Sequence, residues 1–135
     1  MGRDLGAARR WLAAAVLLHL IISILHGQAH AGAHVPLSRA ANLFVFIVIL
    51  AGPLVGLALT WPAERIGIWM IAITMAASLV FGVVNHFVLP SPDHVAQVDR
   101  HWRPLFTTTA VLLGLIEALG SGLAIRVARE RKSAS

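Results

Sequence analysis

Cysteine and tyrosine are absent from this chain, and charged side chains are scarce. Without cysteine there can be no disulfide framework, no thiolate metal site and no cysteine nucleophile. Charged residues make up 13% of the 135 residues, against about 25% in soluble globular domains. The hydrophobic share is 58%, above the roughly 45–50% of such domains. The composition therefore argues against a water-soluble domain, a disordered chain and a coiled coil.

Familiar catalytic patterns are also missing. The sequence has no glycine-rich phosphate loop, no Ser-His-Asp order and no adjacent pair of carboxylates. Of its six acidic residues, only Asp93, Asp99 and Glu117 are placed where they could act together with histidines. The residues thus leave open whether the protein is an enzyme.

Long apolar runs are what the sequence has instead. A helix crosses roughly 30 Å of hydrocarbon with about 20 residues that rise 1.5 Å each. A membrane β-barrel would need alternation of period two, which residues 43–50 lack. We predict an all-α fold, an integral membrane antiparallel four-helix bundle that forms one domain over residues 1–135. The expected spans are residues 9–27, 40–60, 64–89 and 104–127.

The first apolar segment has an alternative interpretation. Basic residues near the N-terminus, an apolar stretch and then Ala29-His30-Ala31 resemble a signal peptide with its cleavage site. We expect the segment to be retained as a span. Cleavage would leave three spans.

Basic residues are unevenly shared between the two expected ends of the bundle. One end has only Arg39, Arg100 and Arg103. The end with both termini has Arg3, Arg9, Arg10, Arg65, Arg126, Arg129, Arg131 and Lys132. The positive-inside rule then predicts cytoplasmic termini, in a bacterial inner membrane. The net charge of +5 follows from this asymmetry and is no argument for nucleic acid. The expected partners are the lipid bilayer and either another membrane protein or a second copy of the chain.

None of the seven histidines falls on the predicted cytoplasmic side. His26, His30 and His34 recur every four residues, so a helix there would place them on one face. Imidazoles at i and i+4 can bind one metal ion. Gly27 and Gly32 weaken a helix in this segment, so the sequence leaves helix and loop as alternatives.

A metal site on the outer face is the leading hypothesis. Its expected ligands are His26, His30, His86 and His94, with Asp93 as a further ligand or an orienting group. Such imidazole-rich sites suit Zn²⁺, Cu²⁺, Ni²⁺ or Fe²⁺. The predicted function is a small, histidine-rich, metal-binding membrane protein that serves as an accessory subunit of a larger redox or transport complex.

Glu117 is the only acidic residue deep inside an expected span. Charging it there costs at least a few kcal/mol, so intramembrane acids are functional by default. His19 is the candidate partner, because it lies in the first span on a small and polar helix face. With His26 and His86, this pair makes up the candidate cofactor-binding residues.

Two other functions remain open at this stage. Histidines on facing helices could be axial ligands of haem b, with His19 or His26 opposite His86, and similar residues would suit a quinone-binding membrane anchor. The third possibility is a purely structural subunit or assembly factor. In that case small residues such as Gly52 and Gly56, spaced as GxxxG, would serve helix packing alone.

Overall fold

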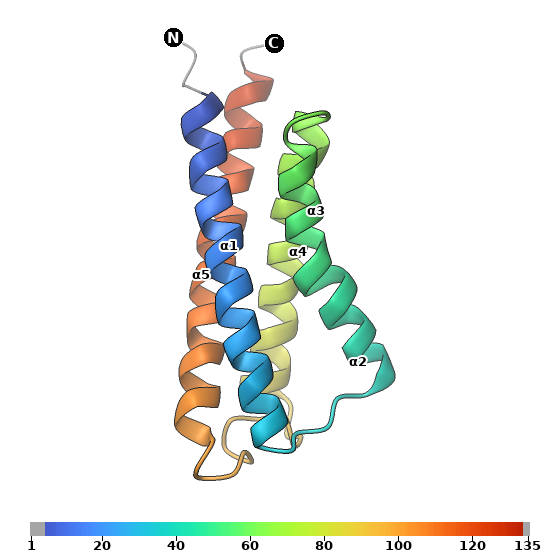
Figure 1. Ribbon diagram of the computed structural model, residues 1–135, viewed down its shortest axis with the longest axis vertical. Coiled ribbons are helices and arrows are strands. Elements are labelled where there is room, and N and C mark those ends of the chain that lie inside the picture. Colours follow the sequence, from blue (N-terminus) through green and yellow to red (C-terminus); the bar gives the residue numbers. More distant parts are fainter. Residues whose placement is uncertain (1–4, 134–135) are drawn as a thin grey trace.

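We describe residues 5–133 of a computed structural model (Figure 1). In this range the chain is helical and has no strand. The elements are α1 (Leu5–Gly32), α2 (Arg39–Phe44), η1 (Val45–Ala51), α3 (Gly52–Leu59), α4 (Glu64–Val83), η2 (Val84–Val88) and α5 (Arg103–Lys132), where η marks π-helical winding.

Four helices in this range are long and apolar enough to cross a membrane. The elements α2, η1 and α3 follow one another as one continuous helix, and η2 extends α4 in the same way. The predicted all-α four-helix bundle is therefore confirmed, and its apolar helices indicate an integral membrane protein.

The helices run antiparallel and create two distinct ends. The described ends of the chain and the turn between α3 and α4 lie together, which we call the terminal end (Figure 1). The connections 33–38 and 89–102 lie at the opposite end, which we call the loop end (Figure 1). At the terminal end, the Glu64 carboxylate lies 3.7 Å from Arg9 and 3.2 Å from Arg131, so it links α1 and α5 to the start of α4.

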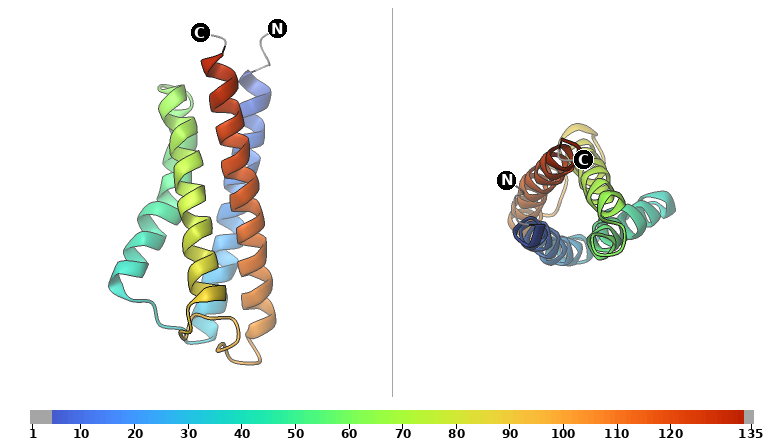
Figure 2. Two further views of the ribbon diagram at one scale, coloured as in Figure 1. Left: turned by 180° about the vertical axis from the view of Figure 1, so that it is seen from behind. Right: turned by 90° about the horizontal axis from the view of Figure 1, so that it is seen from above.

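The α2–η1 segment diverges from the rest of the bundle toward the loop end. Viewed along the long axis, α1, α4 and α5 form a triangle, and α2 projects away from it (Figure 2). The terminal half of the interior is packed with apolar side chains that include Leu12, Val16, Ile71 and Met75. The interior is therefore closely packed at the terminal end, and α2 leaves the bundle toward the loop end.

Glycines allow the close approach of α3 and α4. A Cβ atom on Gly67 would lie 2.5 Å from the carbonyl oxygen of Gly56 and 2.5 Å from the backbone nitrogen of Thr60. A Cβ atom on Gly52 would lie 2.5 Å from Thr74 Cγ2. The GxxxG pattern therefore packs against α4 of its own chain, in keeping with the preference for small residues where membrane helices meet.

We expect Gly67→Ala to destabilise the folded chain by about 1–3 kcal/mol, because the new methyl group meets backbone atoms that cannot rotate away. Gly122→Ala is the matched control, since nothing lies within 4 Å of a Cβ atom at that position. Thermal or denaturant unfolding in detergent measures both variants. Equal unfolding midpoints for the two would contradict the importance of this close approach.

Candidate metal centre

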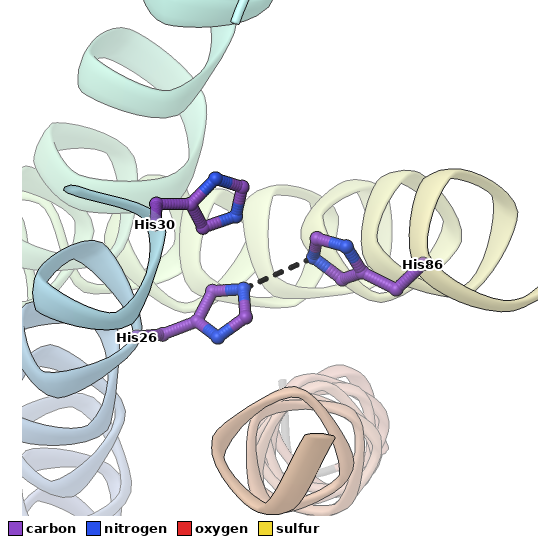
Figure 3. Close-up of side chains that lie close together, drawn as sticks. All are labelled: His26, His30 and His86. Atoms are coloured by element: carbon purple, nitrogen blue, oxygen red, sulfur yellow. Dashed lines mark hydrogen bonds between the residues drawn. The ribbon is translucent and has the colours of Figure 1, made fainter. Parts of the chain in front are cut away.

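Three histidines from two helices converge in the loop half of the bundle. His26 and His30 lie one turn apart on α1, and His86 lies on η2 (Figure 3). Nitrogen atoms of the three rings, one from each, lie within 4.8 Å of one another. We call this group the three-histidine cluster. It forms because α1 remains helical as far as Gly32, so that His26 and His30 share a face.

Hydrogen bonds determine which ring nitrogens carry protons. His86 Nδ1 lies 3.1 Å from the backbone carbonyl oxygen of Asp93, and because a carbonyl can only accept, Nδ1 donates. The Thr109 hydroxyl donates its single proton to the carbonyl oxygen of Leu105 at 2.7 Å. In this arrangement His26 Nδ1, 2.8 Å from the same hydroxyl oxygen, donates to it. Each neutral imidazole then has its lone pair on Nε2.

The Nε2 atoms of His26 and His86 face one another. They are 3.1 Å apart, within hydrogen-bond distance, and the dashed line in Figure 3 joins them. With a proton on the Nε2 atom of one ring, the contact is a hydrogen bond between two neutral imidazoles. With both protons on Nδ1, the two Nε2 lone pairs are free to bind one metal ion. Two nitrogens bound tetrahedrally at about 2.0–2.1 Å from one ion would be about 3.4 Å apart, close to the observed gap.

Asp93, in the 89–102 connection, completes the polar surroundings of the cluster. Its Oδ1 atom lies 3.3 Å from His30 Nε2 and 3.2 Å from His86 Nδ1. Burial alone would raise the pKa of this carboxyl group, but the contact with the His86 N–H and the electrostatic interactions with the three imidazoles outweigh it and lower the pKa below its ordinary value. An ionised carboxylate here orients two imidazoles and offsets the charge of a bound cation.

Phe106 forms an apolar wall of the cluster. Its ring centroid lies 4.7 Å from those of His26 and His30 and 5.2 Å from that of His86, and the residue is fully buried. Sequence reasoning did not identify Phe106 or Thr109 as part of the site. Their only signal is that they lie about one turn apart on α5, on the side that faces α1, and this face cannot be assigned without the packing.

His34 and His94 lie apart from the cluster. His34 follows the end of α1, is exposed and has a left-handed backbone with φ 53°. His94, which the sequence suggests as a ligand, accepts a hydrogen bond at Nδ1 from the backbone nitrogen of Ala96. Within residues 5–133 the structure therefore brings together three of the four histidines proposed from the sequence, with Asp93 beside them.

A second buried pair lies deeper in the bundle. His19 Nε2 is 3.1 Å from Glu117 Oε1, and the two side chains are only 2% and 4% exposed. The pair joins α1 to α5 about two turns further from the loop end than His26. The structure thus brings Glu117 together with His19, the partner that the sequence suggests for it.

A cleft of about 670 Å³ connects these two polar groups. It lies between α1, α4, α5 and the diverging α2–η1 segment. The three-histidine cluster and Asp93 line its loop end, and Ser23, Ser78 and Glu117 line its inner part. The remaining lining is mostly apolar.

Fold and site together define a class of protein, a helical integral membrane protein with a buried three-histidine cluster. No protein-family model matches the chain, and comparisons with curated proteins and with solved structures find no significant match. The function must therefore be argued from the site itself.

Proposed function

We propose that this protein binds one divalent transition-metal ion at the three-histidine cluster. The observation that carries the proposal is the convergence of three imidazole nitrogens within 4.8 Å of one another, with the Nε2 atoms of His26 and His86 facing each other at 3.1 Å. His30 adds a third imidazole, and Asp93 adds a negative charge. Imidazole ligands suit Zn²⁺, Cu²⁺, Ni²⁺ and Fe²⁺, whereas Cu⁺ prefers the sulfur ligands that the cluster lacks.

The residues support a metal centre with an open coordination position. Three protein ligands and a free fourth position are typical of catalytic zinc sites, whereas structural zinc sites use four protein ligands. Thr109 and Asp93 hold the outer nitrogens of His26 and His86, as is usual for metal-bound imidazoles. We propose an accessory role in a larger redox or transport complex of the inner membrane. Both termini would be cytoplasmic, because the basic residues gather at the terminal end.

Haem b fits this geometry less well. Two axial nitrogens on one iron are separated by about 4 Å, twice a metal–nitrogen bond, with the porphyrin plane between them. The facing nitrogens of His26 and His86 are only 3.1 Å apart, and Phe106 packs against both rings. We therefore favour a metal ion bound directly by the histidines.

Elemental analysis of the full chain, purified in detergent without chelators, tests the proposal. We expect roughly one Zn, Cu, Ni or Fe ion per folded chain. A chelated preparation should then bind added Co²⁺ and show visible absorption of a nitrogen-ligated cobalt site. A chain that stays folded but holds no metal and takes up neither Zn²⁺ nor Co²⁺ would overturn the proposal. A Soret band in the purified protein would favour haem instead.

A further inference from the structure

The cleft beside the three-histidine cluster is open to the lipid. Its volume of about 670 Å³ lies within the roughly 300–1,000 Å³ that is usual for small-molecule sites. Apolar side chains at its edge, namely Ile24, Phe46 and Leu115, are each more than half exposed. In a membrane such side chains contact acyl chains rather than water. A ligand would therefore enter the cleft from the bilayer.

Three buried polar atoms without a hydrogen-bond partner belong to residues that line this cleft, namely Ser23 Oγ, His30 Nδ1 and Asp93 Oδ1. Asp93 Oδ1 lies 3.2–3.3 Å from ring nitrogens of His86 and His30, which leaves Ser23 Oγ and His30 Nδ1 to be explained. Buried polar groups in proteins are nearly always paired, so an unpaired group indicates a partner that is not part of the chain. A metal ion could account for the His30 nitrogen, but the Ser23 hydroxyl lies about two turns away on α1 and needs a different partner.

The spacing of these two residues restricts the chemistry of the ligand. Ser23 and His30 are seven residues apart on α1, which places them on one face about 10 Å apart along the axis. A fatty acid is polar at one end only and cannot reach both. A para-quinone has oxygens about 5 Å apart across a flat ring, and a hydrogen bond of about 2.8 Å at each end extends its reach to about 11 Å. The rings of Phe46, Phe81 and Phe87 line the cleft and suit a flat apolar body.

We infer that the cleft binds a membrane quinone or its hydroquinone, with one ring oxygen at Ser23 and the other at the His30 end. The inference rests on the proposed metal centre only at the His30 end, where a bound ion could contact the second oxygen. The apolar cleft and the Ser23 hydroxyl do not depend on a metal.

Binding of decylubiquinone to the full chain in lipid nanodiscs tests this inference. The quinone that co-purifies with protein-containing nanodiscs is measured against empty nanodiscs, with decylbenzene, which lacks the oxygens, as a competitor. Metal content is determined on the same samples. We expect saturable binding in excess of the empty nanodiscs, and we expect decylbenzene to compete poorly.

Two variants with matched controls locate the site. Gly27→Leu fills the cleft from α1, where nothing lies within 4 Å of a Cβ atom, and should weaken quinone binding at least tenfold. Gly122→Leu makes the same change in an equally open position outside the cleft and should bind normally. Ser23→Ala should weaken binding about fivefold through the loss of one hydrogen bond, whereas Ser91→Ala removes a comparable unpaired hydroxyl outside the cleft.

The results separate this inference from the metal proposal. Three results would each overturn the quinone site. Nanodiscs with the wild-type chain could hold no more quinone than empty ones, or decylbenzene could compete as well as the quinone. Gly27→Leu and Ser23→Ala could also both bind quinone as tightly as the wild type. Any of these could occur in a chain with its full complement of metal. Quinone binding that is lost in Gly27→Leu but present in a chelated, metal-free chain would support the cleft site and show that it needs no metal.

Discussion

His86→Ala should abolish tight metal binding, whereas His94→Ala should leave it unchanged. His86 is the residue that η2 contributes to the cluster, and its Nε2 atom faces that of His26. Removing it should lower the affinity by more than the 10–100-fold that is typical when only an outer hydrogen-bonding partner of a ligand is lost. Competition of the protein with a chelator for Zn²⁺ measures the dissociation constant of each variant.

His94→Ala is a close control for this prediction. The substitution is the same, and His94 lies eight positions after His86. Its ring accepts a hydrogen bond from the backbone of the 89–102 connection and is not part of the three-histidine cluster. A loss of affinity as large as that of His86→Ala would mean that His94 is also a ligand, as the sequence predicts. Normal Zn²⁺ affinity in His86→Ala would place the centre elsewhere.

The fold and part of the site could be predicted because the bilayer imposes strong rules. Helices that cross it need long apolar runs, and polar stripes on such helices turn toward one another rather than toward lipid. Helical spacing alone aligns His26 with His30 and brings Glu117 and His19 into consideration as a pair. The structure places both sets of side chains together.

Other parts of the site lacked a periodic signal. Asp93 and His94 are neighbours in a connection without regular structure, so no spacing rule says which of them turns inward. The π-helical winding of η2 changes the direction in which His86 points relative to a regular helix, and such turns are frequent at functional sites. The divergence of α2, which creates the cleft, depends on how neighbouring helices pack, and lipid rewards that packing only weakly.

The buried His19–Glu117 pair should dominate the stability of the middle of the bundle. Either single substitution, His19→Leu or Glu117→Leu, leaves the other group buried without its partner and should cost about 3–5 kcal/mol. The double variant replaces both polar groups by apolar ones and should be much more stable than the sum of the single effects predicts. Glu117→Gln keeps a hydrogen-bonding group of the same size and should cost far less than Glu117→Leu.

Circular dichroism measures the unfolding of the wild type and the four variants in one detergent. The free energies of unfolding then give the coupling free energy between the two side chains. Additive single effects would mean that the two groups do not stabilise each other across α1 and α5.

Metal content of the double variant then separates two roles for the pair. Because the pair lies about two turns from the three-histidine cluster, a stable double variant should bind metal normally. If it does, the pair stabilises the bundle without contributing to the metal site.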